Sequence, residues 1–248
     1  MERSLQKIVY FLLVLIFSQA VYSQVPSQDE QIRLQVWADL DAFPGQFDDE
    51  ILLENADAGT KEKESEATSD FQKVFGYAIN QTKKIAPYLL SGMLEGFEFE
   101  YTPYDKKRNV KEYWEFNLKN EFDFENNTIE YKNPKAINDR LMCWVYCNRT
   151  PMQKTEFEIW NSIVYPKIKG KGKGPVEKGF EGIQIACSEA AKNAVREYWR
   201  KQVKNKPKEI SGFLLLLGNP RVYISEGQYM VDLDFFIQTD RIFMYEHF

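Results

Sequence analysis

The sequence predicts an α+β fold in which an antiparallel sheet of about seven to nine strands packs against two long helices. Apolar residues recur with helical spacing in residues 69–93 and 180–203. Apolar and polar residues alternate through most of the remaining chain, as they do in half-buried strands. With 248 residues, 44% of them apolar, the chain is long enough to bury one sizeable core, or at most two small ones.

The N-terminus has the three-part layout of a secretory signal peptide. A small cationic region precedes an apolar run over residues 8–17, and small residues follow at Ala20 and Ser23. Ten apolar residues are too few to cross a hydrocarbon core, which needs about 20. We therefore expect residues 1–23 to be removed by cleavage after Ser23, or else after Ala20. Residues 24–248 would then form a single secreted or periplasmic domain that is not an integral membrane protein.

The first part of that domain is expected to hold a strand, a short helix and a polar loop. Ile32, Leu34 and Val36 alternate with polar residues, which is typical of a half-buried strand. A short helix is expected at residues 48–54. Residues 55–69 contain no large apolar side chain, so we interpret them as a loop or linker inside the domain.

The first long helix is expected to begin at Ser69 or Asp70 and to present one apolar face as far as Met93. Pro87 lies inside it and predicts a kink or a split near Ile85, because proline removes a backbone donor. A shorter helix is expected at residues 153–164. The remaining strands are expected at residues 97–101, 110–118, 122–124, 140–147, 210–217, 221–225, 228–237 and 241–245.

Glu226 and Gly227 form a plausible two-residue hairpin turn between two of these strands. A turn at this position predicts that Arg221 lies opposite Asp232 on the neighbouring strand. Asp232 is therefore expected to form a cross-strand ion pair on a solvated face.

Positive charge is concentrated in residues 167–208, which contain 12 Lys and Arg against four Asp and Glu. At the start of this stretch lysine and glycine alternate, but the spacing matches neither a phosphate-binding loop nor a dinucleotide fingerprint. We interpret residues 167–174 as a flexible basic loop that is solvated or pairs with acidic strands. The alternative is a patch for an anionic envelope polymer or a lipid headgroup. The lysines of this loop are Lys167, Lys169, Lys171 and Lys173.

Three cysteines in an exported chain suggest one disulfide and one spare thiol. Cys143 and Cys147 share one face of a predicted strand but lie about 13 Å apart, too far to bond each other. Cys187 lies on the inner face of the second long helix. We expect a Cys147–Cys187 disulfide, with Cys143–Cys187 as the alternative.

Few residues offer catalytic or metal-binding chemistry. The single histidine, His247, is the penultimate residue, where a scaffold cannot hold a catalytic or metal-ligating imidazole in place. The remaining weak catalytic candidates are two pairs of carboxylates, each pair on one strand face: Asp39 with Asp41, and Asp232 with Asp234. We expect no cofactor and no metal.

These features favour an exported, non-catalytic protein that binds a protein partner or an anionic envelope polymer. A net charge of −5 argues against a nucleic-acid binder. Two other functions remain open. One is a carboxylate-dependent, glycosidase-like hydrolase, and the other is a carrier of an apolar small ligand.

Overall fold

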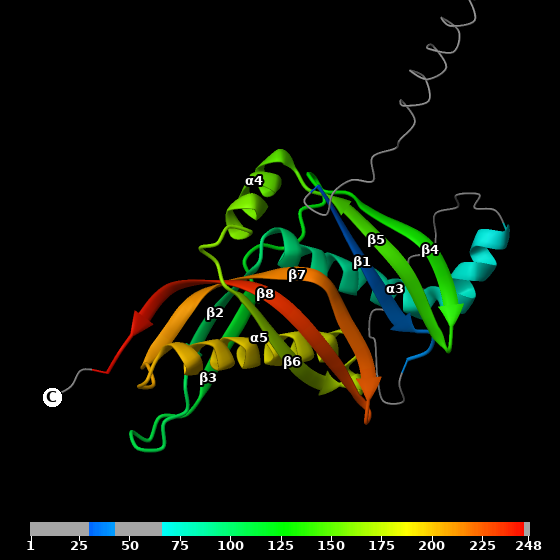
Figure 1. Ribbon diagram of the computed structural model, residues 1–248. Helices are drawn as coiled ribbons and strands as arrows, with labels where there is room; N and C mark the ends of the chain where they lie inside the picture. The colour runs from blue at the N-terminus through cyan, green and yellow to red at the C-terminus, as the bar shows by residue number, and fades with distance from the viewer. Residues whose placement is uncertain (1–29, 43–65, 246–248) are drawn as a thin grey trace, which may run out of the picture.

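The computed structural model describes residues 30–42 and 66–245 and has an α+β fold with antiparallel sheets, as expected (Figure 1). The expected arrangement of one sheet and two long helices is wrong in detail. The described strands form two sheets, of three and five strands, accompanied by three α-helices. The expected signal peptide, the helix at residues 48–54 and most of the expected linker lie outside the described residues.

The three-stranded sheet has the order β1-β5-β4. It comprises β1 (Gln31–Asp39), β5 (Arg140–Asn148) and β4 (Ile129–Ile137). The alternation expected in β1 and β5 is confirmed, because every second residue of each is buried. Strand β4 was not expected. It is exposed along almost its whole length, and the short alternation of residues 129–132 is interrupted at Asn133 and Pro134, where the strand register shifts.

The five-stranded sheet has the order β3-β2-β7-β8-β6. Its strands are β2 (Phe97–Thr102), β3 (Tyr113–Leu118), β6 (Lys167–Pro175), β7 (Glu209–Ser225) and β8 (Gln228–Phe243). The four strands expected after residue 209 are in fact two long ones, and β7 continues through an irregularity between Leu217 and Arg221. Their turn at Glu226 and Gly227 is confirmed, with φ of 53° and 69°.

Three helices pack around these sheets. Helix α3 (Glu66–Leu94) runs through Pro87 as one element and includes the last residues of the expected linker. It contacts β1, β5 and β7, and therefore both sheets. Helix α4 (Pro151–Trp160) begins with a capping box in which the side chain of Thr150 accepts from the backbone of Gln153. Helix α5 (Phe180–Gln202), expected at residues 180–203, packs against β6 and β8.

The basic stretch at residues 167–174 is a strand, β6, and the expectation of a flexible loop is wrong. The reason is visible in its glycines, which face helix α5. A Cβ added at Gly170, Gly172 or Gly174 would overlap the α5 backbone at Ala190, Ala186 and Gly182, respectively. Glycine therefore lets the helix lie directly against the strand, and the helix in turn orders the strand.

Residues 122–124 are also not the strand that their alternation predicted. Phe122 is buried and packs edge to face against Phe124, with 4.8 Å between ring centroids. Asp123 accepts from the backbone N–H groups of Glu125 and Asn126, which closes a turn. Local hydrogen bonding by an aspartate has thus replaced strand pairing.

None of the helices described in residues 30–42 and 66–245 combines the length and apolar character that crossing a bilayer requires.

Replacing glycine by alanine should destabilise the protein at the β6–α5 contact but not at an uncrowded position in another helix. Gly172→Ala should lower the free energy of unfolding by about 2–3 kcal/mol, because its Cβ would overlap the backbone of Ala186 and Ala190. Gly76→Ala in α3 is the matched control, since a Cβ there has open space. It should raise stability by up to about 1 kcal/mol through helix propensity. Urea unfolding of both variants measures this, and equal effects of the two would contradict the packing.

Candidate functional site

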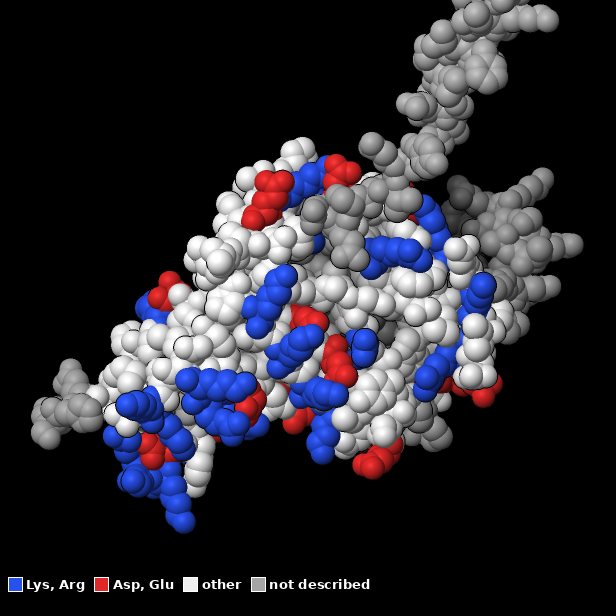
Figure 2. All heavy atoms as spheres, in the orientation of Figure 1, with Lys and Arg blue, Asp and Glu red and all other residues white. Residues whose placement is uncertain are grey.

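Four lysines project from the solvent-facing side of β6, because glycines occupy the alternate positions that face α5. We call Lys167, Lys169, Lys171 and Lys173 the lysine row. Residues two apart on a strand lie about 6.6 Å apart, so the row is a regular line of charges. The side chains of Lys169 and Lys171 are 81% and 73% exposed. Figure 2 shows Lys and Arg alternating with acidic side chains across this part of the surface.

A groove of about 740 Å³ runs beside the lysine row. Its walls come from four elements that are distant in sequence. Strand β6 contributes Lys169 and Lys171, and β7 contributes Asn219 and Arg221. Residues of β8 and α5 complete the walls: Asp232, Leu233, Asp234, Asn193 and Glu197.

Asp232 and Asp234, proposed from the sequence as weak catalytic candidates, are ion-pair partners of the lysine row. Lys169 lies 3.2 Å from Asp234, and Lys171 lies 3.2 Å from Asp232. The expected register is confirmed, because Arg221 lies opposite Asp232. The ion pair itself forms with Lys171, which lies opposite Asp232 on its other side. One carboxylate oxygen of Asp232, Oδ1, is buried without a hydrogen-bond partner.

Positive charge is in excess along the lysine row rather than inside the groove. The groove is lined by three cations, Lys169, Lys171 and Arg221, and by three carboxylates, those of Asp232, Asp234 and Glu197. Lys167 and Lys173 extend the row beyond the groove, so the row and the groove together carry five cations against three carboxylates.

The Lys169–Asp234 pair joins two well-exposed side chains, and such pairs are worth only about 0–1 kcal/mol, so an external anion can take the place of Asp234. The Asp232 side chain is only 26% exposed, so Lys171 remains its partner when an anion binds.

The free edge of β6 is covered by side chains of helix α5. The backbone N–H of Lys173 donates to Glu189 at 2.9 Å, and Asn193 donates to the carbonyl of Lys171 at 2.8 Å. Lysines on an edge strand often serve to block pairing with another sheet. Here α5 already occupies these edge groups, which leaves the lysine row available for another role.

The second carboxylate pair begins in the other sheet, where Asp39 lies opposite Arg140 and 3.3 Å from it. Burial raises the pKa of Asp39, and the charge of Arg140 offsets part of that rise. Asp41 is exposed beyond the end of β1. His247 lies outside the described residues, and the described residues contain no group of three or more His, Cys, Asp or Glu placed to hold a metal ion.

The predicted disulfide is absent from the structure: Cys143, Cys147 and Cys187 are free and buried. Cys143 and Cys147 share the buried face of β5, as the alternation predicted. Helix α5, which carries Cys187, packs against β6 and β8 of the other sheet. All three cysteines are buried on inner faces, as expected. The inner face of β5 belongs to the three-stranded sheet, however, whereas the inner face of α5 packs against the five-stranded sheet.

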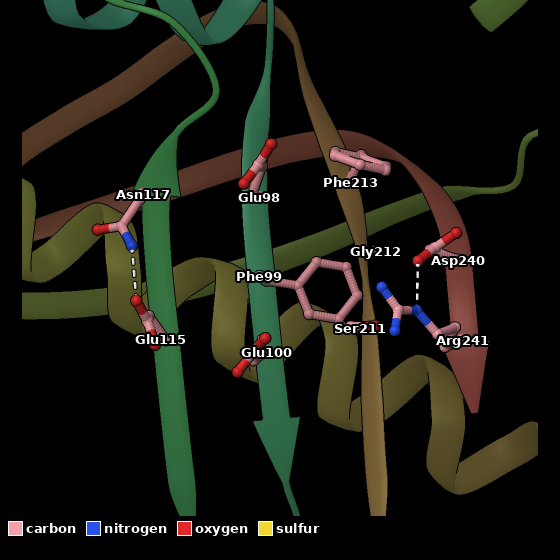
Figure 3. Close-up of a pocket in the computed structure, with 10 residues that line it drawn as sticks. All are labelled: Glu98, Phe99, Glu100, Glu115, Asn117, Ser211, Gly212, Phe213, Asp240 and Arg241. Carbon is pink, nitrogen blue, oxygen red and sulfur yellow. Dashed lines mark hydrogen bonds and ion pairs between the residues drawn. The ribbon is translucent and has the colours of Figure 1, made fainter. Parts of the chain in front are cut away.

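A smaller trough of about 190 Å³ lies over β2, β3 and the paired ends of β7 and β8 (Figure 3). Arg241 pairs with Asp240 at 3.0 Å, and Asn117 donates to Glu115 at 3.0 Å. This volume is below the range of about 300–1,000 Å³ that is usual for small-molecule sites. A small acidic trough does not by itself define a site. Its acidic residues are Glu98, Glu100, Glu115 and Asp240.

The sequence identified the lysines, the aspartates and the pairing of Arg221, but it missed Asn219, Asn193 and Glu197 as walls of the groove. Asn219 follows Gly218, whose φ of 65° belongs to the irregularity in β7. The Gly-Asn-Pro sequence there was a signal for a break in the strand. No local signal indicated that α5 would contribute.

Comparison with known proteins places the chain in a family without assigning a ligand. A protein-family model matches residues 18–245, so the chain belongs to that family, whose function is unknown. A protein of Treponema pallidum (strain Nichols), described only as an uncharacterized protein, is 24% identical over 251 residues. That alignment covers 98% of this chain and 97% of the relative. No solved structure matches the chain.

Because the three thiols are buried, we expect none of them to react with a thiol reagent in the folded protein. Burial raises the pKa of Cys143 and Cys147 to about 11 and that of Cys187 to about 12, so almost no thiolate is present at pH 8. A chromogenic thiol reagent should detect none of the three in the folded protein and all three after denaturation without reductant. Detection of a single thiol in the denatured, unreduced chain would instead show that a disulfide had formed.

Proposed function

We propose that the protein is an exported, non-catalytic protein that binds an anionic polymer of the cell envelope along the lysine row of β6. The observation that carries the proposal is a line of four exposed lysines on one solvent-facing side of a strand, two of which extend beyond the groove and its carboxylates. Regularly spaced anions along an extended polymer can neutralise several such cations at once.

The backbone that carries the lysines is held in place before any polymer binds. Strand β6 pairs with β8 over its whole length, from Lys167 opposite Phe236 to Pro175 opposite Gln228. Its glycines lie against α5, and α5 side chains bond its outer edge. Little backbone entropy is therefore lost on binding, in contrast to the cost of ordering a flexible loop.

The two aspartates support binding rather than catalysis. Asp232 and Asp234 lie on one strand and point to the same face, each paired with a lysine. Acid and base catalysis at a glycosidic bond needs two carboxylates on opposite sides of the bond. Their arrangement instead holds the lysine side chains extended over the surface, where Lys169 can exchange the exposed carboxylate of Asp234 for another anion.

A carrier of an apolar ligand would enclose it in a cavity lined by apolar side chains. The groove beside the lysine row is walled mainly by charged and amide side chains, with Leu217 and Leu233 among them. This composition favours a polar, charged ligand at this surface.

Removal of two lysines tests the proposal. Lys169→Gln with Lys171→Gln should weaken binding of long-chain inorganic polyphosphate by roughly tenfold or more, because each lysine near an anionic surface contributes about 1 kcal/mol. The slope of log affinity against log salt should fall by about two, since two fewer counterions are released. Fluorescence anisotropy with labelled polyphosphate over a range of salt concentrations measures both.

A matched variant separates the lysine row from general basicity. Lys132→Gln with Lys135→Gln makes the same change of charge on β4, an exposed strand of the other sheet. It should leave polyphosphate affinity within about twofold. Equal losses in the two double variants, or binding of orthophosphate as tight as that of the polymer, would overturn the proposal.

A further inference from the structure

Another pocket, of about 620 Å³, lies at the C-terminal end of helix α5. It shares no lining residue with the groove beside the lysine row. It is formed where the C-terminal turns of α5 meet the end of β2, the start of β7 and the connections beside them. Its volume falls within the range of about 300–1,000 Å³ that is typical of small-molecule sites. We call it the Trp199 pocket.

The inner part of the Trp199 pocket is apolar and aromatic. Tyr101 and Ile210 are buried, with 3% and 0% of their surfaces exposed. Trp199 packs edge to face against Tyr198, with 5.3 Å between ring centroids, which holds the indole in place. Tyr104 stands at the rim with 54% of its surface exposed. The rings of Trp199 inside the pocket and of Tyr104 at its rim provide flat surfaces against which a planar ligand can stack.

The mouth of the pocket is cationic. Arg196 and Lys204 are exposed and form no ion pair with any other residue that the structure describes. Arg200 pairs with Glu197 at 2.7 Å, and Lys206 donates to the backbone carbonyl of Tyr104 at 2.7 Å. Figure 2 shows Lys and Arg gathered at this end of the molecule, where α5 ends and the connection between β2 and β3 projects.

The one acidic residue in the lining does not cancel this charge. Glu112 accepts a hydrogen bond from the phenol of Tyr101 at 3.1 Å and lies 3.9 Å from Lys192. Its carboxylate is thus already partnered. Burial and the neighbouring Glu112 carboxylate raise the pKa of Tyr101, and the charge of Arg196 offsets a smaller part of that rise, so the phenol stays protonated and remains the donor to Glu112.

From this combination we infer that the Trp199 pocket binds an aromatic organic anion, with its ring between Trp199 and Tyr104 and its acid group at Arg196 and Lys204. An apolar floor below a cationic mouth is complementary to a ligand that carries a flat apolar body and a single terminal charge. A ligand with only one of these features fits less well. A small inorganic anion would leave the aromatic side chains exposed to water, and an uncharged ring would leave Arg196 and Lys204 without an anionic partner.

Binding of anilinonaphthalene sulfonate tests the inference, since this probe joins aromatic rings to a fixed anion and fluoresces when its rings leave water. The folded protein should bind it saturably with one site. The uncharged phenylnaphthylamine should bind at least about tenfold more weakly, because it lacks the two ion pairs at the mouth. Orthophosphate should displace the probe no better than another salt at the same ionic strength.

Variants then locate the site. Arg196→Gln with Lys204→Gln should weaken probe binding by about tenfold, and Tyr104→Ala, at an exposed position that folding tolerates, should weaken it independently of charge. Lys169→Gln with Lys171→Gln makes the same change of charge in the lysine row and should leave probe affinity unchanged. Circular dichroism confirms that each variant is folded.

Two results would overturn the inference. The first is equal affinity of the folded protein for the sulfonated and the uncharged probe. The second is loss of probe binding in the lysine-row variant but not in the Trp199-pocket variants. Neither result bears on polyphosphate binding, so this inference and the proposed function can fail separately.

Discussion

The contact between the glycine face of β6 and helix α5 is the constraint on which the rest of the structure depends. The glycines meet a row of small residues spaced four apart in the helix, and no side chain fits between the two backbones. Because the helix lies so close, Glu189 and Asn193 reach the edge of the strand. Because the glycines occupy one face, every lysine must occupy the other. The small residues of the helix are Gly182, Ala186, Ala190 and Ala194.

A second contact connects the two sheets, and one of its residues, Asn219, also lines the groove. Where β7 is irregular, the side chain of Asn219 accepts from the backbone of Gln35 in β1 at 3.0 Å. Two residues further along β1, the indole of Trp37 donates to the carbonyl of Val222 at 2.8 Å. These two hydrogen bonds join the two sheets at the irregularity in β7. Beyond the irregularity, β7 pairs with β8 again, with Arg221 opposite Asp232. Buried residues of both sheets belong to one continuous core.

Sequence patterns predicted elements well where burial on one side imposed a period. Strands β1, β2 and β5 and helix α5 follow their alternation or helical spacing closely, and the hairpin turn fixed the register of Arg221 with Asp232. Prediction failed where that signal was weak. Strand β4 is exposed on both faces, and β6 has glycine where an apolar side chain would normally mark the inner face. Phe122 and Phe124 alternate but pack in a turn.

The amino-acid sequence by itself determined which residues face inward, because the period of a strand or helix acts over a few neighbouring residues. It also determined that the chain carries lysines at regular intervals and a basic second half of α5. Only the tertiary structure decided which sheet each strand joins, that the three thiols stay unpaired, and which surfaces the charges share. Lys171 reaches Asp232 and Arg221 through the pairing of β6 with a hairpin that lies about 60 residues later in the chain, and Tyr101 and Trp199 line one pocket where β2 ends beside α5. Such contacts depend on the packing of the whole core, which no local pattern encodes.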